Sequence, residues 1–158
     1  MKLLLTIILC LFVYCVNAQQ PMETEGANLL KAKMVEVSAT YEFQTSADGK
    51  EHAIPFALAY GISDKVEIAV EPVPFTKIKP KAGKSITGAG DIEATLTYNF
   101  FKEKSKAPAL AIAWEVKFPT AKNTLIGTGK TDYTFYLIAT KNIHKFQNHL
   151  NIGYAFIG

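Results

Sequence analysis

The sequence predicts an all-β protein, an antiparallel up-and-down β-barrel that spans a membrane. Three observations lead to this prediction. Segments of about ten residues alternate between apolar and polar side chains, as strands with one apolar and one polar face do. Aromatic residues gather near the ends of the apolar faces, where membrane barrels carry aromatic girdles. The N-terminus has the pattern of an export signal, and no helical period follows it.

Residues 1–18 are expected to be a cleaved secretory signal peptide. Lys2 precedes the apolar run Leu3–Val16, and Ala18 ends a short small-residue cleavage motif. The run is too short for a comfortable transmembrane helix, so a membrane anchor is the weaker interpretation. Together with the predicted barrel, export leads us to expect the mature protein in the outer membrane.

The mature chain begins with a polar stretch that lacks a clear period, and a periplasmic lead-in is expected over residues 19–33. The barrel is expected over residues 34–158. Both cysteines, Cys10 and Cys15, lie in the signal peptide, so the mature chain is expected to have no disulfide and no thiolate metal site.

About seven strands are expected in the barrel. They cover roughly residues 35–44, 53–60, 66–71, 91–100, 109–118, 133–140 and 150–156. Pro55 interrupts the second strand, and a bulge is the simplest way to accommodate it. The fourth and fifth strands alternate without a break and predict a hairpin. Alternation is weakest in the sixth, because Tyr136 and Ile138 make both of its faces apolar.

The connections alternate in length, as in bacterial barrels with short periplasmic turns and longer outer loops. Short turns are expected near residues 61–65, 102–107 and 142–148, an intermediate one at 45–51, and long loops at 76–90 and 119–131. Seven is an odd number of strands, whereas single-chain bacterial barrels close with an even number. We therefore expect an N-terminal part of a larger barrel.

Charged side chains on the predicted polar faces are mostly acidic, which predicts an electronegative lumen that favours cations or binds polar groups of a solute. The alternative is an ordinary hydrated interior. The predicted lumen-lining residues are Glu36, Glu42, Glu67, Glu71, Asp91, Glu93, Glu115 and Lys117. The predicted lipid-facing aromatic residues are Tyr41, Phe43, Tyr98, Phe100, Trp114 and Phe118.

The long loop that begins near Thr76 carries Lys77, Lys79, Lys81 and Lys84 without an acidic residue. Contact with anionic lipid headgroups or steering of anionic solutes is one interpretation, and a solvated flexible loop is the preferred one.

No catalytic, metal or cofactor site is predicted, and the protein is expected to be non-enzymatic. The segment Gly127–Thr131 resembles the end of a phosphate-binding loop, but Thr124 stands where the first glycine is needed and a strand follows instead of a helix. The histidines His52, His144 and His149 are expected in or beside turns without metal-ligand spacing.

The expected partners are outer-membrane lipid and a small-molecule solute. A net charge of +3 is no indication of nucleic-acid binding. The identity of the solute and the oligomeric state stay open.

Several segments resemble the outer-membrane transporters grouped as the meta-pathway phenol-degradation family. They are YGISDKVEIAVEPVPF, GAGDIEATLTYNFF, the stretch from APALAIAWEVKFPT to TFYLIATK, and HLNIGY. The resemblance covers most of the mature chain in the same order. It implies a β-barrel that passes small molecules, including aromatic or apolar ones, across the outer membrane.

Three functions remain in view. The leading expectation is a transporter or channel for small molecules. The second is a structural or adhesive membrane barrel whose lumen is plugged by side chains. The third is a secreted soluble barrel that binds an apolar ligand, which requires the apolar face to lie inside.

Overall fold

The structure is a computed structural model that describes residues 25–158. The predicted signal peptide and the first part of the lead-in, residues 19–24, lie outside the described residues. All regular structure in residues 25–158 is antiparallel β-sheet, which confirms the predicted all-β class. No helix among these residues is long and apolar enough to cross a membrane.

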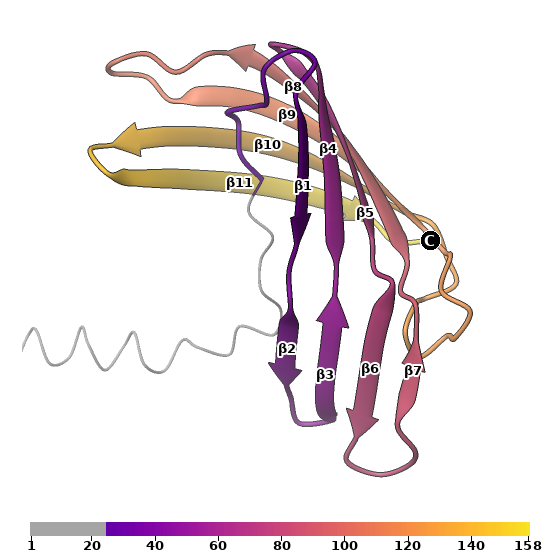
Figure 1. The fold of residues 1–158 in the computed structure, drawn as a ribbon. Coiled ribbons are helices and arrows are strands. Elements are labelled where there is room, and N and C mark those ends of the chain that lie inside the picture. The colour runs from indigo at the N-terminus through magenta and orange to yellow at the C-terminus, as the bar shows by residue number, and fades with distance from the viewer. Residues whose placement is uncertain (1–24) are drawn as a thin grey trace, which may run out of the picture.

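One sheet has seven strands, and Figure 1 shows that it is strongly twisted and curled. In spatial order they are β1 (Val35–Ala39), β4 (Phe56–Ser63), β5 (Val66–Pro72), β8 (Ile92–Phe101), β9 (Ala109–Phe118), β10 (Asp132–Ile143) and β11 (Phe146–Phe156). Every neighbouring pair is antiparallel. The predicted hairpin of the fourth and fifth strands is β8–β9.

A second sheet has four strands. It lies beyond the lower ends of four strands of the first sheet and continues their direction (Figure 1). Its strands are β2 (Glu42–Thr45), β3 (Gly49–Ile54), β6 (Phe75–Pro80) and β7 (Ile86–Gly88). They form two hairpins that meet where β3 pairs with β6. This four-stranded sheet projects from the end of the larger sheet.

The long loop predicted at residues 76–90 is wrong, because this stretch forms most of the β6–β7 hairpin. Thr76 and Ile78 alternate with Lys77 and Lys79, so this strand has a charged outer face, whereas the strands that the sequence predicted each have an apolar one. Strands were predicted only where one face is apolar, and the β6–β7 hairpin was therefore missed.

Three other boundaries differ from the prediction. The turn expected at 45–51 shrinks to residues 46–48, and the turn expected at 142–148 shrinks to His144 and Lys145. Pro55 separates β3 from β4, and its carbonyl accepts a hydrogen bond from the backbone N–H of Thr40 at 3.0 Å. The regular strand hydrogen bonding is therefore interrupted at Pro55.

The described strands do not form a closed barrel. The order of the larger sheet begins at β1 and ends at β11, and the two are not paired. Because each of the six neighbouring pairs reverses direction, these two edge strands run in the same direction. The sheet therefore cannot close on itself through an antiparallel pair of its own edges.

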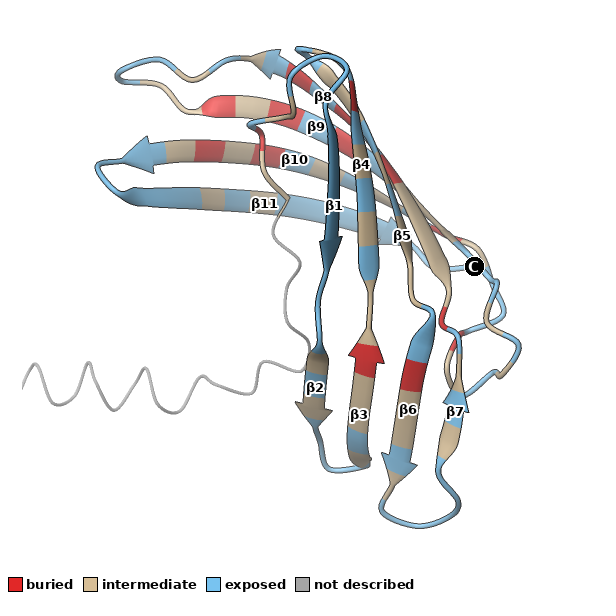
Figure 2. Cartoon of the chain, in the orientation of Figure 1, coloured by how far each residue is buried: buried red, intermediate tan, exposed pale blue. Residues whose placement is uncertain are grey.

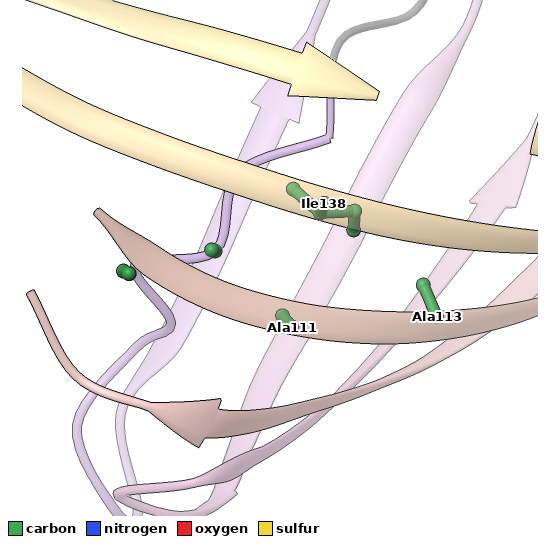
Figure 3. Close-up of a cluster of buried hydrophobic side chains, with 5 residues drawn as sticks. Ala111, Ala113 and Ile138 are labelled. Atoms are coloured by element: carbon green, nitrogen blue, oxygen red, sulfur yellow. The ribbon is translucent and has the colours of Figure 1, made fainter. Parts of the chain in front are cut away.

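The two faces of the larger sheet differ sharply in burial. The face that carries Thr95 and Thr97 is called the inward face here, and the opposite one the outward face. Buried inward residues are small or polar, with Ile138 as the largest buried apolar side chain; they include Thr95, Thr97, Asn99, Ala109, Ala111, Ala113, Ile138 and Thr140. Figures 2 and 3 show the buried positions on β8, β9 and β10 and the packing of Ala111 and Ala113 near Ile138.

Large apolar side chains lie on the exposed, outward face. Ile112 is 50% exposed, Trp114 45% and Leu137 48%, although all three stand in the middle of long strands. Along β8 and β9 every outward residue is apolar and uncharged. This is the reverse of a soluble sheet, which buries its large apolar side chains.

Candidate functional site

A row of charged side chains crosses the inward face near one end of the sheet. The strand register places Glu71 opposite Glu93, Glu93 opposite Lys117, and Lys117 opposite Asp132. Lys117 forms an ion pair with Asp132, and its ammonium also donates to the hydroxyl of Thr128 at 3.2 Å. Glu71 and Glu93 therefore place two carboxylates directly opposite each other in the sheet, with Lys117 on the next strand.

The row borders a pocket of about 250 Å³ where the two sheets meet. Its charged lining residues are Glu42, Glu51, Glu71, Asp91, Glu93 and Lys117. The loop of residues 119–131 supplies Ile126, Gly127 and Thr128 to the same wall. The pocket is therefore acidic and is bounded on one side by a loop.

Asp91 anchors this loop. Its carboxylate accepts a hydrogen bond from the backbone N–H of Ala121 at 2.9 Å. A Cβ atom on Gly127 would come within 2.6 Å of the same carboxylate and 2.7 Å of the Ala121 side chain. Glycine at position 127 is thus required for the close approach of loop and carboxylate.

A second segment lies against the inward face at the opposite end of the sheet (Figure 1). We call residues 25–34 the strap. Its Ala27 is fully buried; the Ala27 N–H donates to the Thr140 hydroxyl at 2.8 Å, and the Ala27 carbonyl accepts from the Asn99 amide at 2.6 Å. The Thr140 hydroxyl also pairs with Nδ1 of His149 at 3.0 Å. Side chains from β8, β10 and β11 therefore hold this point of the strap.

Two carboxylates hold the next part of the strap. Glu67 accepts from the backbone N–H of Leu30 at 2.7 Å, and Asp64 accepts from that of Ala32 at 3.0 Å. Gly61 completes the contact, because its carbonyl accepts from the Lys33 N–H at 2.7 Å and its N–H donates to the Met34 carbonyl at 3.0 Å. The strap therefore binds the polar face through backbone groups that would otherwise be unsatisfied.

The structure brings five of the eight predicted lumen residues together in the acidic pocket. They are Glu42, Glu71, Asp91, Glu93 and Lys117. The other three also lie on the inward face but elsewhere: Glu67 holds the strap, Glu36 is on the edge strand β1, and Glu115 accepts hydrogen bonds from Thr134 and Tyr136. That any of them lines a lumen stays a prediction.

Glu51 is the charged residue of the acidic pocket that was not predicted from the sequence. It was assigned to a turn, whereas it lies inside β3 opposite Ile78. The alternation of Glu51 and Ala53 with Lys50, His52 and Ile54 was the available signal. The loop residue Thr128 had no such signal.

The histidines were expected in or beside turns, and two of the three lie within strands. His52 lies in β3, where its Nδ1 is 2.6 Å from the Tyr41 hydroxyl, and His149 lies in β11 beside the strap. His144 is in the β10–β11 turn. No group of three or more metal-ligating side chains is present within residues 25–158.

The six predicted lipid-facing aromatic residues are all exposed on the outward side: Tyr41 64%, Phe43 53%, Tyr98 43%, Phe100 44%, Trp114 45% and Phe118 43%. Trp114 stacks on Phe135 of the neighbouring strand, with ring centroids 6.2 Å apart, and Phe135 meets Phe156 edge to face. An aromatic cluster therefore crosses the outward faces of β9, β10 and β11.

No protein-family model matches this sequence, and no curated protein matches it either. The resemblance to the phenol-degradation transporters therefore stays a prediction.

Proposed function

We propose that this protein is an outer-membrane channel wall that lets small cationic or uncharged molecules pass along its inward face. The observation that carries the proposal is the sorting of side chains between the two faces. Large uncharged apolar residues are exposed outward, whereas small, polar and acidic residues face inward. Such sorting is stable when lipid is outside and water inside.

Strand length supports the same proposal. β8 and β9 each contain ten residues, which is the length that membrane strands have. At about 3.4 Å per residue such a strand is roughly 34 Å long. Tilted by about 45°, it covers roughly 24 Å along the membrane normal, close to the apolar band of about 25 Å in such barrels. The soluble ligand-binding alternative needs the apolar face inside, and the exposure of Ile112 and Trp114 argues against it.

In the proposed mechanism the acidic pocket filters solutes by charge. Glu71 and Glu93 face each other across β5 and β8, and Glu42 and Glu51 line the same pocket from the four-stranded sheet. A cation that enters this field is attracted, and an anion is repelled. Over a distance of about 8–10 Å, physiological salt screens this interaction strongly, so the selectivity is expected to fall as salt rises.

The proposal is tested by the reversal potential of the full-length protein in a planar bilayer across a potassium chloride gradient. We expect cation selectivity that weakens in the double variant Glu71→Gln, Glu93→Gln. The charge-matched comparison is between the single variants Glu93→Gln and Asp48→Asn, each of which removes one negative charge; Asp48 lies in the β2–β3 turn and is not among the residues that line the acidic pocket. Anion selectivity, or equal effects of the two single variants, would refute the charge filter.

The strap favours a second candidate, a barrel whose lumen is plugged. At least five hydrogen bonds fix residues 25–34 across the polar face. If this plug is permanent, the wild-type protein will insert into bilayers without conductance. A variant that lacks residues 25–33 would then conduct, which separates the plugged barrel from the open channel.

A further inference from the structure

The four-stranded sheet sorts its charges by face as strictly as the larger sheet sorts its apolar residues. Glu42 and Glu51 lie on the side of the acidic pocket. On the opposite side the register places Lys50 opposite Lys79, and Lys77 opposite His52. The outward residues of β2 and β7 are Phe43, Thr45 and Thr87, so none of the four strands places an acidic residue outward.

We call Lys50, Lys77 and Lys79 the basic outward face. Two lysines directly opposite each other in an antiparallel pair repel and destabilise the pairing. Neither of the two ion pairs found within residues 25–158 involves these lysines. Lys81 and Lys84, in the turn between β6 and β7, add two more positive charges at the same end. A counter-charge from another molecule would remove this repulsion.

The basic outward face continues an apolar and aromatic surface. Phe75 precedes Lys77 and Lys79 on β6, Ile54 lies opposite Phe75, and both belong to the outward side. Along the strand, Lys77 and Lys79 lie about 7 and 13 Å beyond Phe75, at roughly 3.3 Å per residue. Headgroup layers are about 5–8 Å deep on each side of the hydrocarbon. If Phe75 marks the edge of the hydrocarbon and the strand is tilted by about 45°, Lys77 and Lys79 lie about 5 and 9 Å above that edge, within and just beyond the headgroup layer.

We propose that the basic outward face binds the phosphate groups of lipid headgroups in the leaflet that surrounds the projecting sheet. The partner is a phosphate-bearing lipid, in the outer leaflet a phosphorylated glycolipid. This inference rests on the proposed membrane function, because it takes the outward face to be in contact with lipid. Lysine suits the role, since its ammonium on a flexible stem binds phosphate as a point charge from several directions.

The test is the affinity of the full-length protein, in neutral detergent micelles, for diphosphorylated lipid A, measured by microscale thermophoresis. A lysine near an anionic lipid surface contributes about fivefold to binding, so the triple variant Lys50→Gln, Lys77→Gln, Lys79→Gln should bind roughly a hundredfold more weakly at low salt. Lipid A without its phosphates should bind weakly to both proteins.

A second triple variant, Lys65→Gln, Lys106→Gln, Lys145→Gln, is the matched control. It loses the same charge from exposed turns at the other end of the strands. Its affinity should stay within about twofold of the wild-type value, because these lysines are remote from the basic outward face. Equal losses in both triple variants, or equal affinity for dephosphorylated lipid A, would overturn the proposal.

Two further measurements distinguish a failure of the lipid-binding proposal from a failure of the proposed membrane function. Millimolar inorganic phosphate that competes fully with lipid A would identify a free-anion site and overturn lipid docking. Insertion of the wild-type protein into neutral phosphatidylcholine vesicles tests the membrane function by itself. Failure to insert, with lipid A binding intact, would refute the proposed function and leave the phosphate-binding surface in place.

Discussion

Replacing Gly61 with alanine should detach the strap from the inward face. Gly61 is buried in β4 and is not among the residues with positive φ, so its backbone accepts alanine without strain. An added Cβ, however, would overlap the carbonyl oxygen of Lys31 and come within 3.1 Å of that of Leu30. Ordinary contact requires the strap to move away by more than an ångström, which breaks its short hydrogen bonds.

The size of the effect follows from the bonds that are lost. Two neutral bonds join Gly61 to Lys33 and Met34, and one bond joins the Leu30 N–H to the Glu67 carboxylate. At about 0.5–1.5 kcal/mol for each neutral bond and 1.5–3 kcal/mol for the charged one, their loss weakens strap docking by roughly 2.5–6 kcal/mol. The detached population then rises at least about 60-fold.

Hydrogen exchange of the strap amides measures this change, because Leu30 and Ala32 donate backbone hydrogen bonds to the carboxylates of Glu67 in β5 and Asp64 in the β4–β5 turn. Exchange at these amides should accelerate at least about 60-fold in Gly61→Ala. The amides of β9 and β10 should be unaffected, which shows that the sheet is intact.

Gly26→Ala is the matched control on the strap itself. Its added Cβ would meet its nearest neighbour, Cε1 of His149, at an ordinary 3.5 Å. Strap amides that stay protected in Gly61→Ala would refute the reasoning. So would equal acceleration in the two variants.

Three further predictions concern other parts of the molecule. Ile112→Lys should destabilise folding into vesicles by about 2–4 kcal/mol, because it puts a charge on the apolar outward face; a urea titration that gives wild-type stability would count against membrane insertion. The hydrogen bond from Lys141 lowers the pKa of Glu103, so the stabilisation it gives is present above the ordinary carboxyl pKa and is lost as pH falls through the lowered value. The difference in Tm between wild type and Glu103→Gln should therefore vanish in acid, and a difference that grows below about pH 4 would contradict this sign. Gly127→Ala should push the 119–131 loop off Asp91 and speed its cleavage by protease, whereas unchanged cleavage would show that the loop tolerates the methyl group.

Strand alternation predicted the parts of the fold in which one face is apolar. The β8–β9 hairpin and β5 were predicted because Ile, Leu, Val and aromatic residues mark their outward sides. The β6–β7 hairpin was missed because Lys77 and Lys79 occupy the outward positions where an apolar side chain was expected. Side chains in β6 do alternate between the two faces, but the outward ones are charged, as residues in a loop often are.

The acidic pocket was only partly predictable. The sequence placed Glu71 and Glu93 on the polar side of their strands, but their direct opposition depends on the pairing of β5 with β8, which a single sequence does not specify. The strap could not be predicted, because it lacks a period and is held through its backbone. A backbone group can form such a hydrogen bond whatever the side chain of its residue, so the amino-acid sequence of the strap does not reveal these bonds.

The strap also has a consequence for the order of folding. Neighbours in the larger sheet are close in the sequence, so its hairpins can form one after another. The bond from Ala27 to Thr140 instead joins residues 113 positions apart, and the bond from Asn151 to the Glu25 carbonyl spans 126. The first part of the strap, Glu25 to Ala27, can bond to Thr140 and Asn151 only once β10 and β11 have formed, although it is synthesised before them. We therefore expect this part of the strap to dock last, which leaves the polar groups of the inward face open to water throughout assembly.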